Sequence, residues 1–420
     1  MIRQFSEIKQ ERISVDKLEI GMFVSEIDRP WSETPFIFQG FKISDEDTLV
    51  ELKQLCKNVV IDVKRSSTLA KHSSHIHTAE HTSEKEKSLT NPVCFERELN
   101  TAEKIFHDSR QNLQSVHQHI KSTRELDFKV IQELVQDCIK SINRNESALT
   151  WLSQIKNTQN YLTEHALRVL VIAIKFGKAL ELDDHKLNLL GLSSLLYDIG
   201  NLQIPNELLT KAGRLNLEER TLVRQHTSKG YEFLQQHDDV PEEVRLVALQ
   251  HHERIDGKGY PQGLTSDKIS ELAKIIAIVD CYDALTSDRS YKTATSPMNA
   301  LKRIYETRGL QFDRLLVEQF INHIGIYPPG YIAELNSGHI GIILSNEDDH
   351  KLRPKILIVR TPDKKSCVER VLDLSSPRKL KNGQTLKIKN VLNNGAFGID
   401  LKFYQEKLLR LWRQSLKETA

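Results

Sequence analysis

The stretch from His251 to Pro261 combines the residue types of a metal site with those of a tight turn. Two adjacent histidines are followed by two carboxylates and then by Gly257, Gly259 and Pro261. Neutral imidazole is the commonest protein ligand of catalytic transition metals, and glycine lets the backbone approach a bound ligand. Adjacent histidines also suit a polar helix end, so the metal interpretation depends on what the rest of the chain supplies.

Further metal-binding side chains fall near the ends or inner faces of other predicted helices. Together with the histidine pair they give the candidate ligands His165, Asp198, His226, His251, His252 and Asp280. A hydrogen-bonded core residue is a sufficient explanation for any one of them. It is a poor explanation for all of them together, and the set indicates a metal centre.

These candidates lie where apolar residues recur at helical spacing. Helices are predicted at about 150–179, 186–197, 217–235, 242–250, 272–285 and 298–307. Two amphipathic helices precede them, and Phe106, Leu113 and Ile120 in the first are seven residues apart. That spacing suits a coiled coil that would make a homodimer, and equally suits packing onto the next domain.

The fold class predicted is multidomain and mainly α. A central all-α helical domain at 150–327 is flanked by a small N-terminal α+β domain at 1–66 and a small C-terminal β module at 328–404. The remaining parts are a polar linker, an amphipathic helical segment and a C-terminal helix or tail, at 67–95, 96–149 and 405–420.

Composition indicates which kinds of partner to expect and in which cellular compartment the protein acts. The 420 residues include 39% hydrophobic and 28% charged residues and carry a formal net charge of +2, which predicts a soluble protein with neither a nucleic acid polymer nor a membrane as partner. Five cysteines are scattered without a metal-binding or disulfide pattern, and no apolar run approaches the ~18 residues that span a bilayer. We expect a cytoplasmic location.

Several motifs, in order along the chain, carry a family resemblance. Residues 195–200, LLYDIG, resemble the motif that names the HD hydrolase superfamily, and the histidine pair with Gly259, Tyr260 and Pro261 resembles its HD-GYP branch. Further matches are KAGRL at 211–215, His226 before Gly230, and DCYDALTSDRSYK at 280–292. Residues 21–41 resemble a small domain of unknown function that often precedes HD-GYP domains.

The resemblance implies a cyclic di-GMP phosphodiesterase that forms pGpG or GMP at a centre of two or three divalent transition metals, iron or manganese. Such ions lower the pKa of a bridging water and neutralise phosphoryl charge. On this pattern Asp198 bridges two metals. His165 and Asp280 hold one metal, and His226 with either His251 or His252 holds the other.

The resemblance also implies contacts with the substrate. It places Asp283, Arg289 and Lys292 against the cyclic dinucleotide, with the loop of Gly259, Tyr260 and Pro261 shaping the pocket. An arginine fork matches phosphate or a guanine edge, and an aromatic ring such as Tyr260 can stack on a base or simply pack.

The sequence departs from the family pattern at positions that bear on catalysis. Tyr197 stands where the family has histidine, and Asn201 where it has lysine; Tyr161 stands where members with three metals have glutamate. At position 197 a neutral phenol is a weak metal ligand, and at position 201 the loss of a cation beside the phosphate would slow the reaction. Because Tyr161 replaces the glutamate of members with three metals, a third metal is not expected.

Three functions are consistent with these residues. The first is a cyclic di-GMP phosphodiesterase with impaired activity. The second is a catalytically inactive cyclic di-GMP receptor or scaffold with protein partners in second-messenger signalling. The third, a phosphohydrolase acting on another nucleotide, fits the Gly259, Tyr260, Pro261 loop less well.

Overall fold

In a computed structural model of the chain, the described residues are 10–28, 41–43, 46–63, 93–154, 160–287, 294–345, 353–376 and 378–418. The chain forms two compact units, one from residues 1–88 with 377–385 and one from residues 89–376 with 386–420. The finer division predicted from the sequence stays a prediction. Most of the predicted polar linker lies outside the described residues.

The first unit contains a small antiparallel sheet and one α-helix. Its strands, in spatial order, are β1 (Gln10–Ser14), β4 (Asn58–Asp62), β2 (Phe23–Ile27) and β3 (Phe41–Lys42), and its helix is α1 (Glu46–Leu55). Apolar residues alternate along β4, so Val59 and Ile61 are buried on one face. The predicted small α+β architecture is confirmed.

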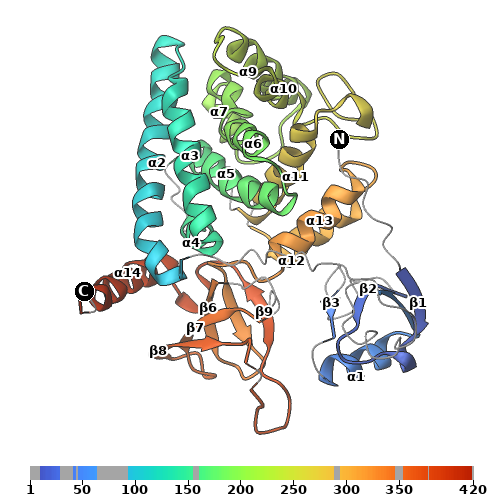
Figure 1. Cartoon of the computed structure of the whole chain (residues 1–420). Helices are drawn as coiled ribbons and strands as arrows, with labels where there is room; N and C mark the ends of the chain where they lie inside the picture. The colour runs from blue at the N-terminus through green and yellow to red at the C-terminus, as the bar shows by residue number, and fades with distance from the viewer. Residues whose placement is uncertain are drawn as a thin grey trace, which may run out of the picture. The chain divides into compact units, whose positions relative to one another are not determined.

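The second unit is mainly helical and holds all of the described candidate ligands. Its longer helices are α2 (Phe95–Thr123), α3 (Phe128–Arg144), α4 (Glu146–Ser153), α5 (Tyr161–Ala179), α6 (Asp184–Leu196), α8 (Leu217–Arg224), α9 (His226–Gln235), α10 (Glu242–Gln250), α11 (Glu271–Thr286), α12 (Pro297–Glu306) and α13 (Arg314–Ile324). Short turns of helix at η4 (Ile199–Gln203), α7 (Asn206–Leu209) and η5 (Ser266–Lys268) join them. The predicted all-α core is confirmed, and Figure 1 shows α5, α6 and α11 at its centre.

Helix α5 is the central element because it is buried on every side. All residues from Thr163 to Gly177 are buried, as expected for a helix enclosed by others. A Cβ at Gly177 would lie 2.8 Å from methyl groups of both Leu187 and Leu190, so this glycine permits the close approach of α6. The two helices can therefore bring their ligand-bearing ends together.

Helix α2 uses its apolar stripe within the same chain. Phe106, Leu113 and Ile120 are buried, and α2 packs against α3 and α4. Of the two alternatives left open by the seven-residue spacing, the structure favours packing onto the neighbouring helices.

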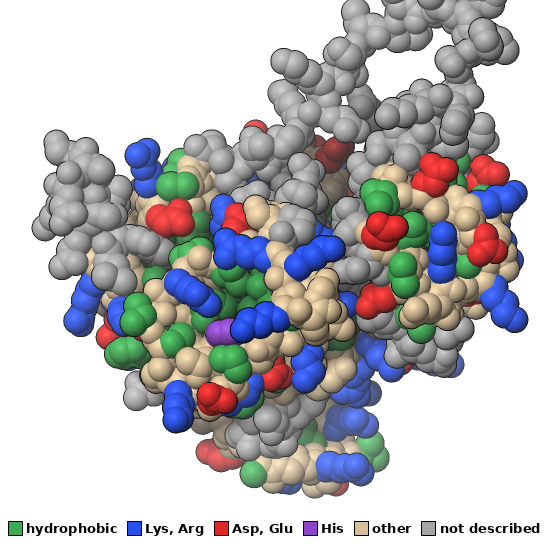
Figure 2. Space-filling view, turned by 90° about the horizontal axis from the view of Figure 1, so that it is seen from below, with side chains coloured by type: hydrophobic (Ala, Val, Ile, Leu, Met, Phe, Trp, Pro, Cys, Tyr) green, Lys and Arg blue, Asp and Glu red, His purple; other side chains and the backbone are tan. Residues whose placement is uncertain are grey.

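The chain closes with the expected antiparallel β module and a last helix. The sheet order is β8 (Ser366–Asp373), β7 (Lys355–Arg360), β6 (Ile340–Ser345), β5 (Ile332–Leu335) and β9 (Ile388–Leu392), and α14 (Leu401–Glu418) follows the short turn η7 (Ala396–Gly398). On the face that Figure 2 shows, Lys and Arg side chains lie beside exposed apolar side chains. In the β module, Lys364 Nζ lies 4.8 Å from the ring centroid of Phe397. Within the described part of the chain, no helix is long and apolar enough to cross a bilayer.

Candidate metal centre

The candidate ligands come from five helical elements. His165 lies in the second turn of α5, Asp198 follows Tyr197 at the end of α6, and Asp280 lies in the second half of α11. His226 begins α9, and His251 with His252 follows α10. The ends of four helices thus meet one side of α11, and side chains distant in sequence converge there.

A glycine pair brings Asp198 close to His226. A Cβ added to Gly200 would lie 1.9 Å from the backbone oxygen of His226 and 2.6 Å from the nitrogen of Gly230. Only glycine fits such an approach of backbone to backbone. The glycine of the LLYDIG segment therefore packs η4 against the first turns of α9.

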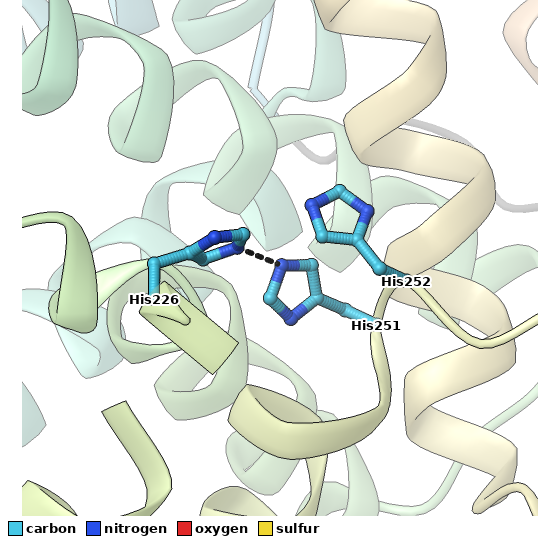
Figure 3. A group of neighbouring side chains, drawn as sticks. All are labelled: His226, His251 and His252. Atoms are coloured by element: carbon cyan, nitrogen blue, oxygen red, sulfur yellow. Dashed lines mark hydrogen bonds between the residues drawn. The ribbon is translucent and has the colours of Figure 1, made fainter. Parts of the chain in front are cut away.

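The three histidines His226, His251 and His252 form one ligand group, with their ligand atoms within 4.8 Å of one another. Figure 3 shows the rings of His226 and His251 pointing toward each other, with Nε2 atoms 3.2 Å apart. Each Nδ1–H donates to a backbone carbonyl: His226 to Val223 at 2.7 Å, and His251 to Ala248 at 3.0 Å. These bonds fix the tautomer and leave both Nε2 atoms as lone-pair donors.

The charge state of His251 agrees with this geometry. Burial, with the neighbouring His252 and His226 rings, holds the pKa of His251 well below its usual value. The ring is therefore neutral at physiological pH. Neutral imidazole is the form that binds metal.

Asp198 lies between this group and a second group. Its Oδ1 is 3.4 Å from His226 Nε2 and 3.7 Å from His251 Nε2, while its Oδ2 is 4.0 Å from His165 Nε2. The second group is His165, Asp198 and Asp280. All the predicted ligands therefore lie close together, in one group of three histidines and one of His165, Asp198 and Asp280.

The second group is already linked by hydrogen bonds within the protein. His165 Nε2 is 3.0 Å from Asp280 Oδ1 and 2.7 Å from the hydroxyl of Tyr197. The Tyr197 hydroxyl also donates to Asp280 Oδ1 at 3.0 Å. On its other nitrogen, His165 lies 2.6 Å from Asp283 Oδ2. Both ring nitrogens of His165 therefore face carboxylates.

Charge in this second group differs from charge in the first. Burial alone would disfavour a charged His165, but hydrogen bonds to Asp280 and Asp283 raise the pKa of the ring to about 9. Burial and the charges of Asp280 and Asp198 raise the pKa of Tyr197 well above its usual value. The chain alone thus holds a protonated imidazole and a neutral phenol here.

Asp283 is an internal carboxylate. It is 1% exposed and accepts two hydrogen bonds from Arg168, at 2.7 and 3.0 Å, besides that of His165. Although burial works against the charged form, Arg168 and His165 hold the pKa of Asp283 well below its usual value. These surroundings favour a role in positioning His165 over the substrate contact that the resemblance implied.

The loop with Gly259, Tyr260 and Pro261 borders the histidine group. Buried Glu253 accepts bonds from three successive backbone N–H groups, of residues 262, 263 and 264, at 2.6 to 3.1 Å. A Cβ at Gly259 would lie 2.4 Å from the nitrogen of Arg254. The ring of Tyr260 lies 4.8 Å from that of His252, centroid to centroid, so Tyr260 packs on a candidate ligand.

The two ligand groups differ in how well they suit a metal ion. Two imidazole Nε2 atoms facing each other beside a carboxylate are a nitrogen and oxygen donor set for a divalent transition metal. His226, His251, His252 and Asp198 therefore fit a metal. His165 and Asp280 fit less well, because Tyr197 lies within hydrogen-bond distance of both ligand atoms.

Comparisons with known proteins agree with this architecture. Residues 151–316 match the HD domain model, and residues 10–131 match a domain of unknown function, DUF3391. A cyclic di-GMP phosphodiesterase of Pseudomonas aeruginosa is 32% identical over 388 residues, which cover 90% of this chain and 91% of that protein.

Two other relatives match shorter parts of this chain. A cyclic di-GMP phosphodiesterase response regulator of Xanthomonas campestris is 31% identical over 212 residues, which cover 50% of this chain and 56% of the relative. A 3'3'-cGAMP-specific phosphodiesterase of Vibrio cholerae is 34% identical over 153 residues, 36% of this chain and 33% of the relative. Both span less of the chain than the Pseudomonas protein does.

The chain belongs to the HD-GYP branch of the HD-domain family. Within this HD-GYP protein, Tyr197 takes the place of the motif histidine and is fully buried. Asn201 lies half-buried in η4, one turn after Asp198. The predicted substrate contacts Arg289 and Lys292 lie outside the described residues.

A third metal would need a further carboxylate ligand close to His165, and the residues near His165 on α5 include Tyr161 and Glu164. Tyr161 stacks on the His165 ring, with centroids 5.4 Å apart and planes 15° apart. Glu164 is paired instead with Arg110 of α2 at 2.6 Å. The carboxylate next to His165 in sequence is thus used in attaching α2 to α5.

Sequence reasoning missed three residues of this HD-GYP site. Arg168 is a buried partner of Asp283, Glu253 organises the loop, and the guanidinium carbon of Arg224 lies 4.6 Å from the ring centroid of Tyr260. Arg168 follows His165 by three residues, so a shared helical face was a usable signal. Nothing in the local sequence pairs Arg224 with Tyr260.

Proposed function

We propose that this HD-GYP protein is a metal-dependent phosphodiesterase that hydrolyses cyclic di-GMP to pGpG or GMP. The observation that carries the proposal is the convergence of the His226 and His251 Nε2 atoms, 3.2 Å apart, beside Asp198. The Pseudomonas relative named as a cyclic di-GMP phosphodiesterase supports the choice of substrate, since its match extends over nine-tenths of this chain.

The chemistry follows from the donor set. A bound divalent ion would supply a water of lowered pKa and a positive charge beside the phosphodiester. The chain's own part is to hold the ligands: carbonyl groups of α8 and α10 fix the His226 and His251 rings, and Gly200 holds Asp198 against them. We propose iron or manganese as the ion, bound by His226, His251, His252 and Asp198.

We propose further that the activity is low. Asn201 carries no charge where the family pattern has lysine, so a cation that would stabilise the transition state is missing. Loss of one such group commonly costs ~10²-fold or more in rate. We also propose that the protein acts in the cytoplasm. Protein partners in second-messenger signalling and a homodimer are further proposals.

A second candidate function has one observation in its favour. Tyr197 is fully buried and bonded to two residues expected to bind metal, which suits a cyclic di-GMP receptor without turnover. The histidine group and the loop would then serve binding alone.

Turnover by metal-loaded protein separates the two functions. The protein is stripped of metal, reloaded anaerobically with manganese or iron, verified by elemental analysis, and incubated with cyclic di-GMP; products are separated chromatographically. We expect slow formation of pGpG or GMP, abolished in Asp198→Asn and retained in Glu306→Gln, an exposed carboxylate on α12. Binding of cyclic di-GMP by verified metal-loaded protein without any product would reject the enzyme and favour the receptor.

The same assay tests substrate choice. Because one relative is named for 3'3'-cGAMP, this dinucleotide is compared with cyclic di-GMP at equal concentration. We expect a higher kcat/KM for cyclic di-GMP. A reversed preference would contradict the proposed substrate while leaving the reaction type intact.

A further inference from the structure

The two ligand groups share Asp198 but differ in where their protons lie. In the histidine group, the Nδ1 atoms of His226 and His251 bond to backbone carbonyls, so the Nε2 atoms of both rings face the centre of the group. These two Nε2 atoms lie 3.2 Å apart in a buried site. One metal ion placed there can accept a lone pair from each ring.

In the other group, protons of the protein fill the space between the ligand atoms. The Tyr197 hydroxyl lies 2.7 Å from His165 Nε2 and donates to Asp280 Oδ1 at 3.0 Å. The hydroxyl thus occupies the space between the His165 and Asp280 ligand atoms that a metal ion would take.

Packing holds Tyr197 in this place. The side chain is fully buried at the end of α6, and its ring meets the ring of His251 edge to face, with centroids 4.8 Å apart. Behind His165, Asp283 accepts from Nδ1 at 2.6 Å and is itself held by Arg168. His165 is therefore fixed from both sides by groups of the chain.

We propose that this chain binds one metal ion, held by His226, His251, His252 and Asp198, and that Tyr197 closes the second position by a hydrogen-bonded cluster with His165 and Asp280. The proposal deepens the proposed function, on which it rests, because it fixes the metal count of the same centre. It differs from the two-metal centre expected from the family resemblance.

Metal content tests the proposal without any substrate. Purified full-length protein is stripped with a chelator, dialysed against manganese, and its bound ion counted by elemental analysis. We expect about one ion per chain. We expect the count to stay near one in His165→Gln and to fall toward zero in His251→Ala. A wild-type count near two, or near zero, would overturn the proposal.

Tyr197→His is the decisive variant, because it restores a nitrogen donor where the phenol stands. We expect its count to rise to about two. Tyr197→Phe removes the hydroxyl but adds no ligand, and its count should stay near one. Thermal unfolding of each variant checks that it is folded; should Tyr197→His not fold, the wild-type count and that of His165→Gln still decide. A folded Tyr197→His that binds only one ion would contradict the role given to Tyr197.

Spectroscopy gives a second readout. The electron paramagnetic resonance spectrum of the manganese-loaded wild type should show an isolated ion, and that of Tyr197→His a spin-coupled pair. If oxidised iron-loaded wild type shows a visible tyrosinate-to-iron charge-transfer band that Tyr197→Phe abolishes, Tyr197 is a ligand and the proposal fails. None of these measurements depends on turnover, so the proposed function can fail while the metal count stands.

Discussion

The group of His226, His251 and His252 (the His226 group) and the group of His165 and Asp280 (the His165 group) lie on either side of the Asp198 carboxylate. Each group contains buried histidine. In the His226 group, backbone carbonyls accept bonds from the Nδ1 atoms, so the Nε2 atoms of His226 and His251 point toward the centre of the group. In the His165 group, Asp283, Asp280 and Tyr197 surround the ring and keep it protonated. Whether a histidine is suited to bind a metal ion or to pair with a carboxylate therefore depends on the groups that hydrogen-bond to its ring.

Because the two groups differ in their hydrogen-bond partners, we expect one to serve metal binding and the other to stabilise the fold. The His226 group presents two Nε2 atoms to one point, an arrangement that suits a metal ion, so we assign this group to binding. The His165 group is satisfied without metal, so it contributes to folding. Substitutions in the two groups should therefore act on different measurements.

The largest effect is expected from His251→Ala. It removes a metal ligand, so cyclic di-GMP hydrolysis should fall by more than ~100-fold, beyond what loss of an outer partner of a ligand costs. The free energy of unfolding of the metal-free protein in a denaturant titration should fall less than in Arg168→Leu, because His251→Ala removes no partner of a buried charge. A large loss of metal-free stability with metal content unchanged would reverse the roles of the two groups.

Arg168→Leu should give the largest loss of stability. It leaves the buried Asp283 carboxylate with only His165 as a charged partner, and breaking a buried pair in this way costs ~3–5 kcal/mol. Urea unfolding of the metal-free protein measures it. The matched control is Arg314→Leu, which breaks an exposed pair with Glu318 and should cost less than ~1 kcal/mol. Equal costs for the two variants would show that the Asp283 cluster does not stabilise the fold.

Much of this centre was predictable from sequence, because its ligands fall within recognisable local patterns. Helical periodicity predicted the last residues of α5, α6 and α11 to within about one residue, but it predicted a single helix over 150–179 where the structure has α4 and α5. The family motifs in order along the chain pointed to His226 and the pair at His251. The side chains of Arg289 and Lys292 lie outside the described residues, so their predicted contacts stay predictions.

What sequence did not predict depends on tertiary contacts. Asp283 lies within a motif that implies substrate contact, yet it is buried because Arg168 on another helix neutralises it. Tyr197 reads as a missing ligand, but the closeness of its hydroxyl to both His165 and Asp280 is set by how α5, α6 and α11 pack. Such partners lie more than 80 residues apart along the chain for Tyr197 and Asp280.

The same cluster predicts a dependence of metal-free stability on pH. The folded-state pKa of His165, about 9, lies above its unfolded value of 6.5. Its contribution is therefore fully present below pH 6.5 and is lost as pH rises through about 9. Each pKa unit corresponds to ~1.4 kcal/mol. Between pH 6 and pH 9.5, the free energy of unfolding of the wild type should therefore fall by about 3 kcal/mol more than that of His165→Gln.

Denaturant titrations of the two proteins in chelator, at both pH values, measure this difference. Subtracting the variant removes the other groups that titrate over the range. Parallel losses in wild type and His165→Gln would show that His165 is not charged in the folded protein.

The smallest effect is expected at the edge of the His226 group, from Arg224→Ala. Arg224 is exposed, and its guanidinium lies over the ring of Tyr260, which in turn packs on His252. An exposed cation–π contact contributes ~0.5–1 kcal/mol, so loss of the stack should weaken cyclic di-GMP binding only about two- to five-fold. Isothermal titration with the inactive Asp198→Asn background measures this without turnover. Arg220→Ala is the matched control, since it removes a nearby exposed charge whose field reaches Tyr260 but which has no ring contact among the described residues. If both variants weaken binding equally, the effect of Arg224 is its charge alone, and the ordering of Tyr260 against the metal-binding histidines does not depend on it.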